Sequence, residues 1–234
     1  LNGTLLAKKY DFNYSTTDYN ELLKDNDIDT ILITTRHNLH AQLVIDSLKA
    51  NKNVFVEKPL ALNKQELDKI IDCYNKQKNP SIMVGFNRRF SPHIQSIKKS
   101  INNGPINIIA TMNAGFIPKE HWVHDMQIGG GRIVGEACHY MDLCNYLTGS
   151  TIKSVCMNSM GEESNQSTDN ASILLKFHNG SHATINYFSN GAKSYSKERI
   201  EVYQNESTWI MDNFRNTTGY NTPNFNKIKT SLDK

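Results

Sequence analysis

A short apolar run that ends in glutamate, lysine and proline is the feature that most restricts how this chain can fold. Val54-Phe55-Val56 is apolar and β-branched, which is typical of a buried parallel strand. Glu57-Lys58-Pro59 follows directly, and the proline ends the strand because it has no backbone N–H to donate. Ligands bind at the carboxyl ends of strands in open α/β sheets, so Lys58 is predicted to point into a crevice. There it can carry a proton or stabilise charge; a solvated Glu-Lys pair is the alternative interpretation.

Strands and helices are predicted to alternate around this run. Asp18 has the position of an N-cap, and Asn63 with Glu66 has the pattern of a reciprocal capping pair. This alternation favours a parallel, doubly wound sheet in the first part of the chain. The predicted strands are 29–35, 54–56 and 82–86, and the predicted helices are 19–23, 39–50 and 63–77.

The second half of the chain is predicted to form a different kind of domain. Strands joined by short turns replace the alternation, and Asn179-Gly180 is a strong signal for a hairpin. A mainly antiparallel open sheet is therefore expected, with a helix after Ser91-Pro92 that runs to about Ile101. The predicted strands are 106–113, 154–160, 171–177, 182–189, 199–203 and 207–211.

A second predicted helix in this half runs from Arg132 to about Leu147 and has two distinct faces. Arg132, Glu136 and His139 share one face, with Asp142 beside it. A cation, a carboxylate and an imidazole that project together can bind a hydroxylated substrate and move its proton. A solvated face with one ordinary histidine is the alternative. The predicted core stripe is Ile133, Val134, Ala137, Met141 and Cys144.

Composition narrows the classes of function. The chain has 234 residues, of which 38% are hydrophobic, and none of its apolar runs approaches the ~20 residues that cross a bilayer. A net charge of +3, evenly spread, argues against nucleic acid or membrane partners. The four cysteines have no disulfide-framework spacing, so reduced thiols in the cytoplasm are expected. His121 and His124, with Cys138 and His139, match no standard zinc spacing, and no metal is predicted.

Taken together, these motifs resemble the Gfo/Idh/MocA family of NAD(P)-dependent oxidoreductases, which includes glucose–fructose oxidoreductase and inositol dehydrogenase. Residues 28–40 and 53–60 match the strands of its cofactor domain and its Glu-Lys-Pro signature. Residues 85–90 resemble the segment where the family crosses into its second domain. Gly129-Gly130-Gly131, followed by His139, resembles the triple glycine and the helix that carries the family's histidine.

The resemblance implies an α/β plus α+β fold in two parts. Residues 1–88 would form an incomplete Rossmann-type parallel sheet, and residues 89–234 a mainly antiparallel open-sheet domain for substrate binding and oligomerisation. In the family, a G-x-G-x-x-G turn that cradles the pyrophosphate comes first, and this chain contains no such turn. The chain is therefore interpreted as an internal fragment that should not hold a dinucleotide firmly. Fusion to an upstream dehydrogenase-like domain would be compatible with this interpretation.

The resemblance also assigns roles to residues. It implies hydride transfer between NAD or NADP and a hydroxyl carbon of a sugar, nucleotide sugar or polyol. Lys58 and His139 would be catalytic: Lys58 would hold the reacting oxygen, and His139 would act as general base, its neutral form being available near pH 7. The predicted cofactor contacts are Thr35, His37, Glu57 and Lys58. The predicted substrate contacts are Arg88, Asn113, Trp122, His124, Arg132 and Glu136.

The chain departs from the family at three places. Relatives usually have an aspartate four residues before the histidine, and this chain has Gly135 there, so Glu136 is the candidate substitute. Trp122-Val123 stands where relatives commonly have Trp-Arg. Arg36-His37 stands where they tend to have Pro-Asn, so either residue could meet the cofactor or a charged substrate.

Two other functions are compatible with the same motifs. One is a family member that cleaves a glycosidic bond through transient oxidation, using the cofactor catalytically. The other is a non-catalytic binding or assembly module, which the missing turn and Gly135 would favour. In the resembling family the open sheet often pairs with another subunit, so a homo-oligomer is expected.

Overall fold

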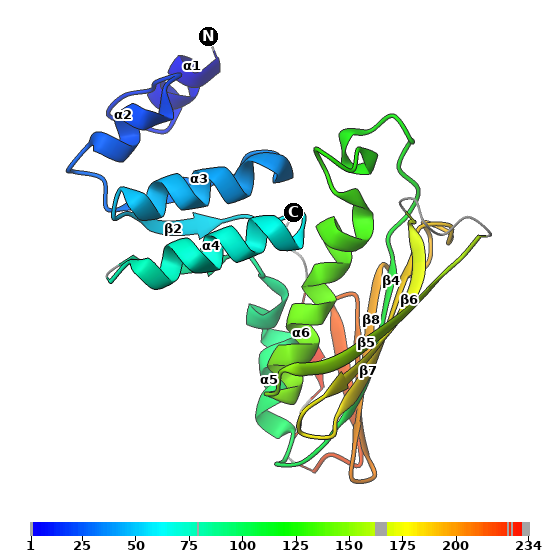
Figure 1. Cartoon of the computed structure of the whole chain (residues 1–234). Coiled ribbons are helices and arrows are strands. Elements are labelled where there is room, and N and C mark those ends of the chain that lie inside the picture. Colours follow the sequence, from blue (N-terminus) through cyan, green and yellow to red (C-terminus); the bar gives the residue numbers. More distant parts are fainter. Residues whose placement is uncertain (1, 79, 162–167, 224, 226, 231–234) are drawn as a thin grey trace. The chain divides into compact units, whose positions relative to one another are not determined.

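The structure is a computed structural model that describes residues 2–78, 80–161, 168–223, 225 and 227–230. The chain divides into two compact units, Leu1–Gly85 and Phe86–Lys234, whose elements are traced in Figure 1. Each unit has its own cluster of buried hydrophobic side chains. The division lies close to the predicted boundary at residue 88.

The first unit contains a parallel sheet of three strands in the order β1-β2-β3. The predicted alternation of strands and helices is confirmed. β1 and β3 are shorter than predicted, and β2 begins one residue earlier than predicted. The strands are β1 (Thr30–Ile33), β2 (Asn53–Val56) and β3 (Ile82–Val84), and the helices are α1 (Asn2–Lys9), α2 (Tyr19–Lys24), α3 (His37–Lys49) and α4 (Lys64–Lys76).

Side-chain caps begin two of these helices where the sequence predicts them. The Asp18 carboxylate accepts a hydrogen bond from the backbone N–H of Asn20 at 2.9 Å. At α4, Asn63 Oδ1 accepts from the Glu66 N–H at 2.9 Å, and Glu66 in turn accepts from the N–H of Leu62. The reciprocal cap is therefore present, with the glutamate bonded one residue earlier than in the usual capping box.

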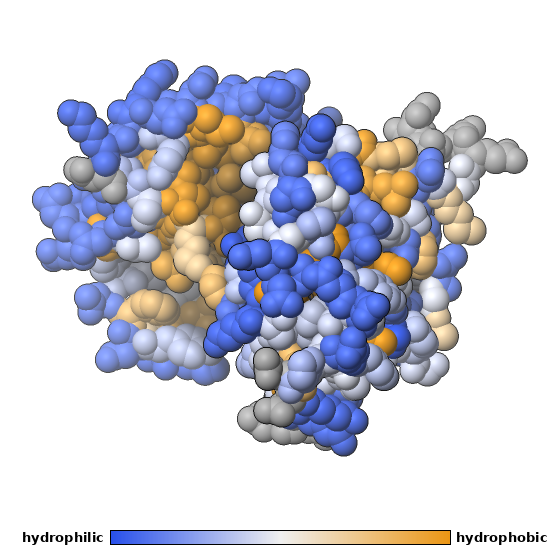
Figure 2. Space-filling model, turned by 90° about the horizontal axis from the view of Figure 1, so that it is seen from below, coloured by the Kyte–Doolittle hydropathy of each residue, from blue (hydrophilic) through white to orange (hydrophobic). Residues whose placement is uncertain are grey.

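The two faces of this sheet have different environments. Val54 and Val56 are buried on one face, together with Val44 and Leu48 of α3. The side chains in register on the other face are Leu32, Phe55 and Met83; Leu32 is 68% exposed and Met83 is 50% exposed. One face of the sheet is thus left largely uncovered by the described residues of this unit. Figure 2 shows one side of the molecule, where hydrophobic residues gather in patches within a mainly hydrophilic surface.

The second unit contains an eight-stranded sheet in the order β11-β10-β9-β8-β4-β7-β6-β5. All neighbouring strands are antiparallel except β4 and β7, which confirms a mainly antiparallel sheet. The strands are β4 (Asn107–Asn113), β5 (Ile152–Ser159), β6 (Asn170–Phe177), β7 (His182–Phe188), β8 (Glu198–Gln204), β9 (Ser207–Asp212), β10 (Asn216–Tyr220) and β11 (Ile228–Lys229). The helices are η1 (Arg88–Phe90), α5 (Pro92–Ser100), η2 (Trp122–His124), η3 (Ile133–Ala137) and α6 (Cys138–Thr148).

Helices α5 and α6 lie on one face of this sheet (Figure 1), and strand alternation supplies the core beneath them. On β4, Ile108, Ala110 and Met112 are buried, while Ile109 between them is 39% exposed. The predicted hairpin joins β6 to β7, and Gly180 has a φ of +89°, a conformation that favours glycine.

The helix predicted from Arg132 to Leu147 is not a single α-helix. A π-helical turn, η3, comes first, and α6 follows it and ends at Gly149, which has the left-handed conformation of a helix cap. The predicted core stripe of this segment is confirmed in part. Ala137 and Cys144 are fully buried as expected, Ile133 and Met141 are partly buried but pack against the core, and Val134 is only partly buried. The other buried residues of this segment are Tyr140, Leu143 and Leu147.

Two short strands, β10 and β11, were absent from the sequence predictions. β10 is Asn-Thr-Thr-Gly-Tyr, which has no apolar alternation, and it is a strand because it pairs with β9 along its whole length. None of the helices in the described ranges combines the length and the apolar character that a membrane crossing requires.

Candidate active site

In the first unit, a buried histidine joins the loops that follow β1 and β2. His40, on α3, has its Nδ1 2.7 Å from the Pro59 carbonyl oxygen and its Nε2 3.1 Å from the Thr35 carbonyl oxygen. One imidazole therefore fixes the spacing of two loops at the carboxyl end of the sheet, where α/β folds bind ligands. The sequence predictions gave His40 no such role, because both of its partners are backbone atoms.

The side chain of Glu57 is held against the end of β3. Its Oε2 accepts a hydrogen bond from the Lys58 N–H at 3.3 Å. A Cβ added at Gly85 would lie 3.2 Å from the same oxygen, so any larger residue there would crowd the carboxylate. Lys58 is half-buried, and its peptide bond to Pro59 is cis. Glu57 and Lys58 thus lie in the loop after β2, and the contact with Gly85 at the end of β3 restricts the position of the Glu57 carboxylate.

The other two predicted cofactor residues lie beside this loop. Thr35 is exposed, and its hydroxyl donates to the Arg36 carbonyl at 3.3 Å. His37 is buried in the first turn of α3, with its ring 5.7 Å from the ring of His40. All four residues predicted to contact the cofactor therefore belong to the two loops that His40 joins, or to the helix that carries it.

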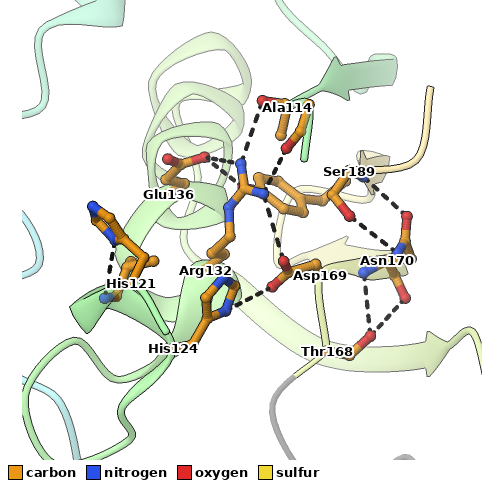
Figure 3. A network of polar contacts seen from close by, with 12 residues as sticks. Ala114, His121, His124, Arg132, Glu136, Thr168, Asp169, Asn170 and Ser189 are labelled. Carbon is orange, nitrogen blue, oxygen red and sulfur yellow. Dashed lines mark hydrogen bonds and ion pairs between the residues drawn. The ribbon is translucent and has the colours of Figure 1, made fainter. Parts of the chain in front are cut away.

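In the second unit, Arg132 is the centre of a buried polar network (Figure 3). Its side chain is 1% exposed, and its guanidinium donates to the carbonyl oxygens of Gly115 at 2.7 Å and Ala114 at 3.3 Å. It also pairs with two carboxylates, Glu136 at 3.3 Å and Asp169 at 3.5 Å. One buried positive charge is therefore shared by two acidic groups from different parts of the chain.

Tyr187 completes the network on the side of Glu136. Its hydroxyl donates to Glu136 Oε2, and its ring lies 5.4 Å from the Arg132 guanidinium. Burial, and then this hydrogen bond, raise the pKa of Tyr187 well above its ordinary value, so the hydroxyl remains a donor. Glu136 therefore already has two partners, a cation and a phenol.

His124 meets the network through Asp169. Its Nδ1 lies 3.7 Å from Asp169 Oδ1, and Figure 3 shows the two side chains facing each other. The opposite ring nitrogen, Nε2, is buried and has no hydrogen-bond partner among the described residues. Three of the predicted substrate residues, His124, Arg132 and Glu136, are thus brought together, with Asp169 linking them.

His139 lies in the first turn of α6 and is 7% exposed. Its ring packs edge-to-face against Phe86, with the ring centroids 6.0 Å apart. Gly135 is buried in the π-helical turn η3 that precedes it. Asp142, expected beside the same helix face, is instead bound by the guanidinium of Arg89.

Arg88 has a carboxylate partner of its own. Its Nε and Nη2 each lie 2.9 Å from an oxygen of Glu198, a bidentate pair between η1 and β8. The guanidinium also lies 5.4 Å from the ring of Tyr140. Burial lowers the Arg88 pKa, but the hydrogen bonds and the charge of Glu198, with the nearby Tyr140, together outweigh burial, so the pKa lies above its ordinary value. Two of the Arg88 donors, Nε and Nη2, are thus bonded within the protein.

The last two predicted substrate residues lie in separate segments. Asn113, at the end of β4, donates from Nδ2 to the Ala192 carbonyl at 2.7 Å, while its Oδ1 is buried without a hydrogen bond. Trp122 lies in η2, and its ring is 5.7 Å from that of His121. Across the described residues, side chains of His, Cys, Asp and Glu form no group of three or more suited to a metal ion.

Sequence reasoning missed the acidic partners in both places. Asp169 precedes β6 and Glu198 begins β8, and each is joined to an arginine distant in sequence. The only local signal was an acidic residue at the start of a predicted strand, which does not identify its partner.

Comparison with known proteins identifies the family. Residues 2–105 match the family model described as "Oxidoreductase family, NAD-binding Rossmann fold", and residues 96–209 match the C-terminal domain of the same Gfo/Idh/MocA family. The oxidoreductase YrbE of Bacillus subtilis is 31% identical over 91% of this chain and 63% of its own length. Myo-inositol 2-dehydrogenase of Thermotoga maritima is 29% identical over 86% of this chain and 61% of its own length.

Solved structures have the same fold. A levoglucosan dehydrogenase in complex with NADH and levoglucosan superposes with a TM-score of 0.85 over 97% of this chain and 68% of that chain, at 23% identity. The chain thus spans somewhat less than two thirds of the length of the two curated relatives above. From the two family models and these likenesses, the chain belongs to the Gfo/Idh/MocA family of oxidoreductases.

Proposed function

We propose that this chain is part of an NAD(P)-dependent oxidoreductase that transfers a hydride between nicotinamide and a hydroxyl carbon of a sugar, nucleotide sugar or polyol. Membership of the family supports the reaction class, and relatives named as dehydrogenases of myo-inositol and levoglucosan support the substrate class. The observation that carries the proposal is the Glu57-Lys58-Pro59 loop at the carboxyl end of β2, fixed to the loop after β1 by His40.

The residues of the first unit fit a nicotinamide cofactor. Two loops at the carboxyl end of a parallel sheet are held together by a buried imidazole, which leaves Thr35, Glu57 and Lys58 at that edge. Glycine at position 85 leaves room for the carboxylate of Glu57. Thr35, His37, Glu57 and Lys58 would hold the cofactor, which when bound supplies the acceptor or donor of the hydride.

Two side chains of the chain would manage the charge and the proton of the reacting hydroxyl. The ammonium of Lys58 would stabilise negative charge on the oxygen, since a developing alkoxide is costly where water is excluded. The imidazole of His139 would take the hydroxyl proton as general base. The network of Arg132, Glu136 and Asp169, with His124, would bind the remaining hydroxyl groups.

Arg88 is better suited to positioning than to substrate contact. Its bidentate pair with Glu198 occupies its guanidinium and joins the start of the second unit to β8. Asn113 and Trp122 would line the substrate site as uncharged side chains.

We also propose that the protein assembles through the uncovered face of the eight-stranded sheet. Helices α5 and α6 cover one face, and among the described residues the opposite face presents Ile109, 39% exposed, and Leu174, 50% exposed. These two lie in one row, joined across β7 by Thr184. Exposed apolar side chains in a row on an open sheet suit burial against a second copy of the same surface.

Substitution of the two catalytic candidates tests the proposed reaction. In the complete protein, Lys58→Met and His139→Gln should each reduce kcat for NAD(P)-dependent oxidation of polyols such as myo-inositol by about 100-fold or more, because each removes a group that acts on the reacting hydroxyl. Lys64→Met and His178→Gln are matched controls at exposed positions. Turnover equal to that of the controls in both variants would reject the assignment.

A further inference from the structure

Within the proposed substrate network, an imidazole, a carboxylate and a guanidinium lie in a row, and the proposed reaction does not yet give each of them a role. His124 Nδ1 faces Asp169 Oδ1 at 3.7 Å, and Asp169 Oδ2 faces Arg132 Nη1 at 3.5 Å (Figure 3). Arg132 is itself held by two backbone carbonyl oxygens. The guanidinium is thus fixed by the backbone, and it fixes the carboxylate in turn.

We propose that Asp169 is a positioning residue that sets the tautomer of His124, so that His124 Nε2 accepts a hydrogen bond from a substrate hydroxyl. The inference rests on the proposed function for the identity of the ligand as a polyol or sugar. The tautomer itself follows from the chain's own residues.

Hydrogen-bond chemistry decides which nitrogen carries the proton. An ionised carboxylate only accepts, so the nitrogen that faces Asp169 must be the donor. In a neutral imidazole the other nitrogen, Nε2, then has the free lone pair. Asp169 therefore converts His124 from a group with two interchangeable nitrogens into an acceptor of defined direction.

The unpaired ring nitrogen of His124 points to a ligand. His124 Nε2 and Asp169 Oδ1 are both buried without a hydrogen bond among the described residues, and the His124 side chain is only 12% exposed. A buried acceptor without a partner is costly, and protein interiors rarely leave one. A hydroxyl group supplies the missing donor. The 3.7 Å separation is longer than a hydrogen bond, and catalytic contacts of this kind commonly shorten when the substrate binds.

Asp169→Asn provides the sharpest test because it keeps the shape and reverses the chemistry. Arg132 only donates, so it orients the amide oxygen of the new side chain toward itself. The amide NH2 then faces His124 Nδ1, which must accept, and the proton moves to Nε2. Wrong-tautomer effects of this kind are known where an aspartate orients a catalytic histidine.

Two measurements on the protein detect this change of the His124 tautomer. The first measurement uses long-range 1H–15N spectra of 15N-histidine-labelled protein, in which the signals of His124 are assigned by their loss in His124→Gln. In the parent protein His124 should be the Nδ1–H tautomer. In Asp169→Asn it should be the Nε2–H tautomer. In kinetics with myo-inositol as probe, KM should rise about tenfold with kcat within about twofold, as expected for loss of one uniform binding contact. Asp68→Asn, on the exposed surface of α4, is the matched control.

The outcomes separate this inference from the proposed function. An unchanged tautomer in Asp169→Asn overturns the positioning role, whatever the activity. A KM effect of Asp169→Asn that persists in the His124→Gln background also overturns it, because Asp169 would then act without His124. If Asp169→Asn does not fold, the spectrum of the parent protein decides: His124 as the Nε2–H tautomer refutes the proposal. Absence of any dehydrogenase turnover, with the tautomer reversed, rejects only the proposed function.

Discussion

Replacing Arg132 by methionine should destabilise the second unit far more than loss of an ordinary ion pair. Methionine fills a similar volume, but it leaves Glu136 and Asp169, which are both largely shielded from solvent, without their shared cation. It also leaves the carbonyl oxygens of Ala114 and Gly115 without a donor. Removing one partner of a buried pair costs about 3–5 kcal/mol, because the remaining charge stays in a medium of low dielectric constant. We therefore expect the free energy of unfolding to fall by about 3–5 kcal/mol.

Urea unfolding followed by tryptophan fluorescence measures this loss in the relevant unit. The chain has two tryptophans, Trp122 and Trp209, and both lie in the second unit. With an m-value of about 2 kcal/mol per molar urea, the predicted loss lowers the midpoint by about 1.5–2.5 M. The matched control is Arg199→Met, which removes a partly exposed Arg199–Glu201 pair of 2.7 Å on the sheet surface. Its expected cost is at most about 1 kcal/mol.

The test compares the loss of unfolding free energy in Arg132→Met with the loss in Arg199→Met. If Arg132→Met costs no more than Arg199→Met, the buried network does not depend on its guanidinium. That result would refute the reasoning that Arg132 holds Glu136 and Asp169 in place, and it would weaken the positioning role of Asp169.

Two further predictions concern stability and assembly. Burial lowers the pKa of His93 below 6.5, so between the two values the unfolded chain binds more protons than the folded chain; stability should therefore fall as pH drops below about 6.5, and urea midpoints should depend less on pH in His93→Gln. On the open sheet, Ile109→Lys together with Leu174→Asp should shift the native mass measured by light scattering from an oligomer toward a monomer, and a monomeric parent protein would contradict assembly through this face.

Apart from helix α1, which was not predicted, the elements of the first unit could be predicted because their signals are local. Asp18 and Asn63 are each bonded to a backbone N–H within three residues, so short sequence windows contain both partners. The apolar runs of β1 to β3 need no distant contact to be recognised as strands. His40 was missed as a structural residue because its partners are carbonyl oxygens, which every residue has.

The π-helical turn η3 shows where such local reasoning ends. A periodicity of 3.6 residues predicted the contact between Arg132 and Glu136, which is confirmed by their ion pair. The same periodicity predicted a continuous α-helix from Arg132, but residues 133–137 form a π-helical turn, and Tyr140 rather than Met141 is fully buried. Whether a turn widens depends on the packing around it, and no pattern in the segment itself indicates it.

The distant partners of the charged residues could not be predicted from the sequence. Arg88 and Arg132 could both be recognised as candidates for a site, but a buried guanidinium needs a carboxylate, and the topology selects which one. Buried ion pairs add little stability over apolar residues of the same size, so stability alone does not explain the Arg132 network. Two atoms of this network, His124 Nε2 and Asp169 Oδ1, have no hydrogen bond among the described residues. Arg132, held by backbone carbonyl oxygens, fixes the direction of the Asp169 carboxylate. A network that is costly to bury and incompletely satisfied is best explained by a ligand that completes it.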